Sequence, residues 1–238
     1  MNVNLLIDGA GEFGIKIEPV QIELLSKYKD LVLEWNEKIN LTAITNDDDF
    51  IIKHFLDSFS LLTLENFDGK KKLIDVGTGA GFPGIPLKIL RPDLDVLLLD
   101  SLNKRVKFLN EAIERLGLTG ITAIHSRAEE AARNVLYKEK FDICVSRAVA
   151  NMTTLSKYCL PFVKSGGYFC AMKGRETTDE LNFAKSAIIT LGGSVDDVKE
   201  INLPFSDIKH TIIVVKKFVK HRQNVSEKSK ALHKNKRK

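Results

Sequence analysis

Apolar side chains recur at helical spacing twice before the first strand-like run of the chain. The first set lies between Pro19 and Ile39, and the proline falls in the first turn of the helix that this spacing predicts. The second set follows Asn46, where the acidic residues 47–49 suit the start of a helix. We therefore expect two amphipathic helices, whose inner faces carry Leu24, Tyr28, Leu31, Val32, Trp35 and Ile39 in the first and Ile51, Phe55, Ser58, Phe59 and Leu62 in the second.

From Leu73 onward, short apolar runs alternate with segments of helix length. This alternation is typical of β-α-β units and predicts a parallel sheet. The predicted strands lie near residues 73–76, 95–100, 121–125, 141–146 and 167–172, and the predicted helices cover 84–91, 104–116, 128–137, 151–163 and 178–191.

The pattern changes after this region. Residues 194–203 and 211–217 are two strand-like runs, and the segment between them is too short for a helical crossover. They predict an antiparallel hairpin at the edge of the sheet. Five parallel strands followed by such a hairpin indicate an α/β fold of the Rossmann-like class I methyltransferase type, with a mainly parallel seven-stranded sheet and an N-terminal helical extension.

Four glycines follow the first predicted strand, at positions 77, 79, 81 and 84. Glycine lets the backbone adopt positive φ and approach a ligand closely, so this turn indicates a nucleotide-like cofactor; a turn that binds nothing rarely needs so many. The spacing formally fits a dinucleotide, for which Pro83 is a poor match. The charge of Asp75 would repel a pyrophosphate and would suit the sulfonium and ammonium of S-adenosylmethionine. Taken alone, the loop leaves both cofactors open.

The second predicted strand ends in Asp100 and Ser101. An acid roughly 20 residues past the glycine turn is placed to accept hydrogen bonds from ribose hydroxyls, which favours a ligand that contains adenosine. The same position suits a cap of the next helix, and one side chain can do both.

Polar residues also follow the next three predicted strands, at the edge where ligands bind in this class of sheet. The turn that contains Ala128 and Glu129 either presents a carboxylate to an adenine edge or caps a helix. Arg147 could hold the carboxylate of the cofactor, an RNA phosphate or the face of a base, and Lys173 suits a phosphate contact. His54, in the second predicted helix, is either structural or brought near the substrate by a helical cap.

Residues that other methyl acceptors require are missing from these loops. No Asn-Pro-Pro-Tyr-like tetrapeptide follows the fourth strand, as attack by an adenine amine would need, and no cysteine stands there as a nucleophile for pyrimidine C5. The acceptor that remains needs no deprotonation. Guanine N7 is such an acceptor, because alignment and desolvation alone can activate its lone pair.

Composition narrows the class of protein further. The 238 residues are 44% hydrophobic and 28% charged, which suits one large α/β domain with a small appendage. No run approaches the roughly 18 apolar residues of a membrane span, and the N-terminus lacks the order of a secretion signal, so we expect a cytoplasmic protein. The three cysteines lack the spacing of metal ligands; we expect buried thiols and no metal.

The net charge of +5 is concentrated at one end of the chain. From Lys216 onward there are ten Lys or Arg and one acidic residue, whereas the rest of the chain carries 26 basic and 30 acidic residues. We expect residues 218–238 to form a basic, disordered tail, which either tethers polyanions in a salt-sensitive way or only aids solubility.

The chain as a whole resembles the bacterial family of small-subunit ribosomal RNA guanine-N7 methyltransferases, also known as glucose-inhibited division protein B. The segments that carry the resemblance are Trp35-Asn-Glu-Lys-Ile-Asn-Leu-Thr42, His54-Phe-Leu-Asp-Ser58, Leu73 to Pro86, Leu99-Asp-Ser-Leu-Asn-Lys-Arg105, Ser126-Arg-Ala-Glu129, Ser146-Arg-Ala148 and Lys173-Gly174. The resemblance implies S-adenosylmethionine as methyl donor and the guanine at position 527 of 16S ribosomal RNA as target. It also implies cofactor contacts at Gly77, Phe82, Ala128, Glu129 and Arg147.

Together these inferences predict a helical extension at 1–70, a methyltransferase domain at 71–217 and a basic tail. We expect the glycine loop (Gly77, Gly79), Asp75, Asp100 and Glu129 to hold the donor, and Arg147 and Lys173 to place the guanine without a general base. The expected partner is 16S ribosomal RNA or the small subunit, the expected state a monomer. The alternatives are a non-catalytic ribosomal RNA-binding or assembly factor, a nicotinamide-dependent oxidoreductase and, with less support, a small-molecule methyltransferase.

Overall fold

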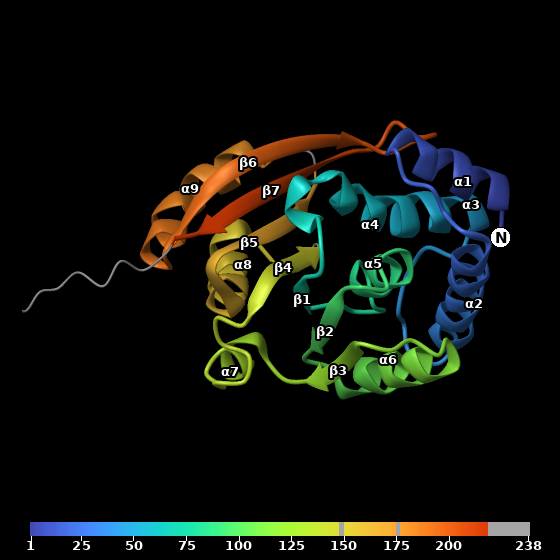
Figure 1. Ribbon diagram of the computed structural model, residues 1–238, viewed down its shortest axis with the longest axis horizontal. Coiled ribbons are helices and arrows are strands. Elements are labelled where there is room, and N and C mark those ends of the chain that lie inside the picture. The colour runs from blue at the N-terminus through green and yellow to red at the C-terminus, as the bar shows by residue number, and fades with distance from the viewer. Residues whose placement is uncertain (148–149, 175–176, 219–238) are drawn as a thin grey trace, which may run out of the picture.

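The centre of the computed structural model, which describes residues 1–147, 150–174 and 177–218, is a seven-stranded sheet (Figure 1). The strand order is β3-β2-β1-β4-β5-β7-β6, in which the first five strands along the chain are parallel and β7 pairs antiparallel with both β5 and β6. The predicted mainly parallel sheet with a terminal hairpin is thus confirmed. The strands are β1 (Lys72–Val76), β2 (Asp95–Asp100), β3 (Ile121–His125), β4 (Phe141–Arg147), β5 (Val163–Lys173), β6 (Gly193–Asn202) and β7 (Lys209–Lys217).

Helices cover both faces of the sheet (Figure 1). Side chains alternate between faces along each strand, so β1 sends Leu73 into one buried apolar cluster and Ile74 into another. The first cluster lies against α5 (Gly84–Leu90) and α6 (Asn103–Arg115), and the second against α7 (Ala128–Ala131), α8 (Met152–Cys159) and α9 (Thr178–Thr190).

The helices that precede β1 lie on the α5 and α6 side of the sheet (Figure 1). They are α2 (Pro19–Asn36) and an unbroken helical stretch made of α3 (Asp47–Phe50), the π-helical η1 (Ile51–Leu56), α4 (Asp57–Phe59) and the 3-10 turn η2 (Ser60–Thr63). Leu25 and Phe55 belong to the same apolar cluster as Leu73 and Ile85. The predicted N-terminal helices therefore form, and they share a core with the sheet.

A further helix, α1 (Val3–Glu12), was not expected from the sequence. The chain has glycine at positions 9, 11 and 14, and glycine lowers helix propensity. Gly9 nevertheless allows close packing, because a Cβ at this position would lie 2.3 Å from Cδ1 of the Leu56 side chain. The close approach of two helices therefore explains a residue that weakens the sequence signal for a helix.

Two predicted helix ends are wrong. The helix expected over 128–137 ends at Ala131, because Val135 and Leu136 are 77% and 68% exposed and give a longer helix no face to bury. The helix expected over 151–163 ends at Cys159 and continues as the 3-10 turn η4 (Leu160–Phe162), in which Pro161 lacks an N–H for the helical ladder. Strand β5 then begins at Val163 instead of 167.

None of the helices in the described ranges is long and apolar enough to cross a membrane. The predicted basic tail lies outside the described residues, apart from Phe218.

Candidate active site at the carboxyl ends of the strands

The loop between β1 and α5 is anchored from below by Asp75. Its Oδ2 accepts hydrogen bonds from Thr78 Oγ1 at 2.6 Å and from the Gly84 amide at 2.9 Å, at the start of α5. The carboxyl is fully buried, and Oδ1 has no partner. Burial raises the pKa of Asp75 to about 6, against the lowering effect of these two hydrogen bonds. Asp75 thus fixes the shape of the loop from beneath, and it lines neither of the two cavities that lie over this edge of the sheet.

The glycines of the loop meet two different physical demands. Gly77, Gly79 and Gly81 have φ of 72°, 62° and 93°, which disfavour other residues. Gly84 is required by space, since a Cβ there would lie 2.4 Å from Leu98 Cδ2. The loop also depends on the N-terminal helices, because the buried Tyr28 hydroxyl of α2 donates to the carbonyl of Ala80.

Asp100 ties the loop to the end of β2. Its Oδ2 accepts from the Gly79 amide at 2.9 Å, and its Oδ1 accepts from the Leu102 amide at 2.9 Å, just before α6. Arg105 Nη1 lies 3.6 Å from Oδ2. The side chain therefore supports the start of α6, as one of its two predicted roles requires, and it also lines a cavity in which the other role is possible.

Two neighbouring cavities lie over this edge of the sheet and share Gly77 and Ser101. We call the first, of about 290 Å³, the β3-side cavity, and the second, of about 420 Å³, the loop cavity. Most predicted site residues line one or the other. The β3-side cavity is lined by Val76, Gly77, Leu99, Ser101, Ser126, Arg127, Ala128, Glu129 and Tyr158, and the loop cavity by Leu41, His54, Gly77, Thr78, Gly79, Ala80, Phe82, Asp100, Ser101, Arg105 and Arg147.

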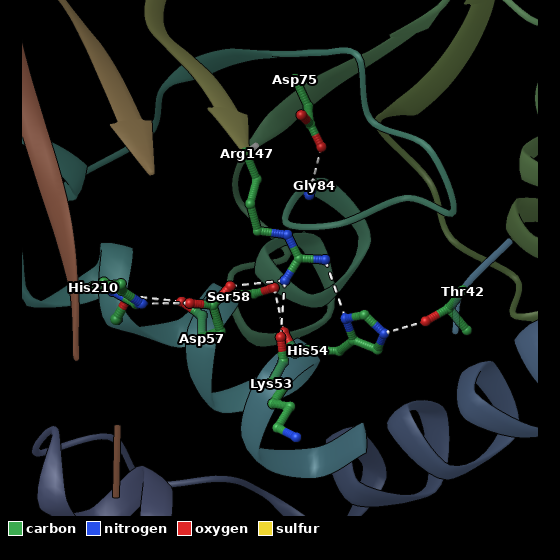
Figure 2. A network of polar contacts seen from close by, with 10 residues as sticks. Thr42, Lys53, His54, Asp57, Ser58, Asp75, Gly84, Arg147 and His210 are labelled. Atoms are coloured by element: carbon green, nitrogen blue, oxygen red, sulfur yellow. Dashed lines mark hydrogen bonds and ion pairs between the residues drawn. The ribbon is translucent and has the colours of Figure 1, made fainter. Parts of the chain in front are cut away.

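Arg147 extends from the end of β4 to the N-terminal helical stretch (Figure 2). Its Nη1 donates to Asp57 Oδ2 at 2.7 Å and to the Lys53 carbonyl at 3.1 Å, while Nη2 lies 3.1 Å from His54 Nδ1. On the other side of Asp57, Oδ1 lies 2.6 Å from His210 Nδ1 of β7. The guanidinium is thus held by three groups of the segment that the sequence suggested as a cap.

His54 serves this network as a neutral side chain. Burial, and next the charge of Arg147, lower its pKa to about 3. An arginine only donates, so His54 Nδ1 must accept and Nε2 must carry the proton toward Thr42 Oγ1, 2.8 Å away. Both ring nitrogens are therefore engaged, and His54 is not free to act as a base.

Phe82 lies beneath these residues, with only 4% of its surface exposed. Its ring stacks on His54, with centroids 4.4 Å apart, and the Arg147 guanidinium carbon lies 5.1 Å from its centroid. Tyr28 and Phe50 pack around it. The ring thus forms the floor of the loop cavity.

Lys173 lies apart from the two cavities that hold the other candidates. Its ammonium contacts Glu180 and the carbonyl of Ala150, both at 2.8 Å. It lines a third cavity, of about 370 Å³, on the other side of Arg147.

Sequence reasoning missed Asp57 and His210. They are 153 positions apart in the chain, and neither follows a strand, so no local pattern linked them to Arg147. Asp57 does fall within the His54-Phe-Leu-Asp-Ser58 segment, which was the one signal available. The described residues contain no cluster of three or more His, Cys, Asp or Glu side chains that could hold a metal ion.

The model of the rRNA small subunit methyltransferase G family, GidB, matches residues 21–212 of the chain. The chain belongs to this family. Ribosomal RNA small subunit methyltransferase G from Acetivibrio thermocellus is 56% identical over 214 residues, which cover 90% of this chain and 88% of that protein. Its counterpart from Alkaliphilus metalliredigens is 50% identical over 213 residues, covering 90% and 89%.

Membership of the GidB family confirms the resemblance inferred from the sequence, and the chain is a methyltransferase. Solved structures support the fold. TrmN from Thermus thermophilus has a TM-score of 0.53 at 16% identity, covering 71% of this chain and 53% of its own. TYW2 from M. jannaschii, in complex with AdoMet, has a TM-score of 0.53 at 17% identity, covering 74% and 80%. The oxidoreductase alternative has no support from these relatives.

Proposed function

We propose that this GidB-family chain transfers the methyl group of S-adenosylmethionine to N7 of a guanine in 16S ribosomal RNA, the one at position 527. The observation that carries the proposal is the pair of neighbouring cavities at the carboxyl ends of β1, β2 and β4, which share Gly77 of the glycine loop. The chain would act in the cytoplasm as a monomer, on the small subunit or its RNA.

The chemistry of the lining fits this cofactor. The β3-side cavity offers apolar side chains and the Glu129 carboxylate, which suit an adenosine, and Asp100 in the loop cavity suits ribose hydroxyls. Arg147 and Arg105 supply positive charge that suits the carboxylate of the cofactor. The Asp75 carboxyl, whose buried Oδ1 lacks a partner, acts through the loop that it holds.

When bound, S-adenosylmethionine supplies a sulfonium methyl group, which the lone pair of guanine N7 can accept with no proton to remove. The residues of the chain therefore need only to position the guanine against the methyl donor and to exclude water from both. Phe82 forms an apolar floor on which His54 stacks, and the ion pair with Asp57 fixes the direction of the Arg147 guanidinium. Lys173 lies on the side of Arg147 away from the glycine loop, where a phosphate of the RNA would be held.

The proposal is tested by transfer of a radiolabelled methyl group to small subunits and to naked 16S ribosomal RNA that lack the modification. We expect incorporation close to one methyl per RNA. Binding of S-adenosylmethionine without transfer to either substrate would favour the alternative of a non-catalytic RNA-binding factor.

A further inference from the structure

The third cavity, of about 370 Å³, adjoins the loop cavity, because His54 and Arg147 line both. Its volume lies within the range of about 300–1,000 Å³ that is usual for small-molecule sites. It lies among the ends of β4, β5 and β6, the start of β7 and the helical stretch that carries Asp57. We call it the β7-side cavity. His54 and Arg147 would therefore border a group bound there as well as the loop cavity.

The lining of the β7-side cavity combines three kinds of surface. Apolar side chains make up much of it, which suits the faces of an aromatic base. Three lysines stand around it. The exposed Lys209 suits a phosphate next to the nucleotide, whereas Lys53 is paired with Asp49 and Lys173 with Glu180, each at 2.8 Å, so these two mainly add positive charge around the cavity. The apolar residues are Ile44, Met172, Leu203 and Ile208, and the lysines are Lys53, Lys173 and Lys209.

The third kind of surface is the carboxylate of Asp57, whose side chain is 11% exposed. Burial alone would raise its pKa, but the His210 hydrogen bond and the Arg147 charge outweigh burial and lower it. An ionised carboxylate only accepts hydrogen bonds, at about four lone-pair sites. Arg147 engages Oδ2 and His210 engages Oδ1, so each oxygen keeps capacity for a further donor (Figure 2).

We infer that the β7-side cavity receives the target base and that Asp57 selects guanine by accepting hydrogen bonds from its N1–H and N2 amino groups. This inference rests on the proposed function. Guanine presents both donors on its Watson–Crick edge, whereas adenine presents an acceptor at N1, which would face the carboxylate unpaired. This contact leaves the Hoogsteen edge of guanine, which carries N7, open to the methyl donor.

In the test, the full chain is first saturated with S-adenosylhomocysteine. It is then titrated separately with GMP, IMP and AMP, and the affinity for each nucleotide is measured. IMP keeps N1–H but lacks the N2 amino group, so affinity should fall in the order GMP, IMP, AMP, with GMP preferred over AMP by roughly tenfold or more. In Asp57→Asn the GMP preference should shrink to about twofold or less. The matched control is Asp142→Asn, at the other end of β4, which should keep the preference.

Loss of the ion pair with Arg147 could unfold part of the Asp57→Asn protein, but the ratio of the GMP and AMP affinities is insensitive to such unfolding. As a second variant, Ile208→Trp should fill the cavity and abolish GMP binding while the affinity for S-adenosylhomocysteine stays within twofold. Equal binding of GMP and AMP, no binding of either, or an unchanged preference in Asp57→Asn would each overturn the inference. Methyl transfer to ribosomal RNA decides the proposed function separately: transfer without guanine preference would remove this inference alone.

Discussion

Arg147 at the end of β4 and Asp57 in the N-terminal helical stretch form an ion pair, with Nη1 2.7 Å from Oδ2. The pair joins two segments that are 90 positions apart in the chain. His210 of β7 holds the same carboxylate from the other side. The N-terminal helices are therefore part of the candidate site, because they set the direction of the guanidinium between the loop cavity and the β7-side cavity.

Replacement of Arg147 by alanine should lower kcat/KM for methyl transfer by at least about 100-fold, since misplacement of the reacting groups is enough to cause such a loss. Arg147→Lys should recover little, because an ammonium cannot reproduce the contacts of the guanidinium with Asp57, His54 and a carbonyl together. The assay is steady-state transfer to small subunits, with folding checked by circular dichroism. Arg115→Ala, in an exposed ion pair on α6, is the control and should be close to wild type. Near-normal turnover in Arg147→Ala would contradict the site assignment.

Gly84→Ala should damage the glycine loop, because the new Cβ would meet Leu98 Cδ2 at 2.4 Å and Asp75 Oδ2 at 2.9 Å. We expect a destabilisation of about 1–3 kcal/mol, typical of overpacking, and at least about tenfold weaker binding of S-adenosylmethionine in calorimetry. Gly11→Ala in α1 is the control, since its Cβ would meet nothing within 4 Å and alanine favours a helix. Equal cofactor affinity in the two variants would show that the loop does not hold the donor.

Asp75 should make folding stability fall as the pH rises from about 4 to 6. Burial raises its pKa from 3.8 to about 6 in the folded chain, so the folded state binds a proton more tightly than the unfolded state. Below the pKa of the unfolded state, Asp75 contributes its full stabilisation. This contribution is lost as the pH rises through the pKa of the folded state, and the free energy of unfolding falls by roughly 3 kcal/mol. In Asp75→Asn this component should vanish. Urea unfolding of both proteins at pH 4 to 7 measures the difference, and parallel pH profiles would refute the assignment.

Removal of residues 219–238 should weaken binding to 16S ribosomal RNA and reduce its dependence on salt, because each phosphate contact by a basic residue releases counterions. Affinity for S-adenosylmethionine should not change. The measurement is RNA binding of the two chain lengths over 50–300 mM salt. An unchanged salt slope would leave the tail with a role in solubility only.

The parts of the site that follow from local pattern were predictable from the sequence. The glycine loop and Glu129 follow strands, and Asp100 and Arg147 are the last residues of strands. These strands alternate with helices, and parallel strands bring their carboxyl ends to one edge. The direction of a side chain was not predictable: Asp75 was expected to face the cofactor, and the structure buries it under the loop.

Contacts made by tertiary packing escaped sequence reasoning for a different reason. Asp57 and His210 meet only because β7 inserts beside β5, which places the start of β7 next to the N-terminal helical stretch. The helix α1 was missed because Gly9 lowers helix propensity, while its real function is to admit Leu56. A residue chosen for close packing thus gave a misleading local signal.

Mapping of the methylated atom decides whether guanine N7 accepts the methyl group. 16S ribosomal RNA lacking the modification would be methylated by the chain and then treated with borohydride and aniline, which cleave RNA at N7-methylguanine. We predict a single cleavage, at the guanine at position 527, which is absent when the enzyme is omitted and strongly reduced with Arg147→Ala. Incorporated methyl without any cleavage would place the methyl group on another atom and would show that guanine N7 is not the acceptor.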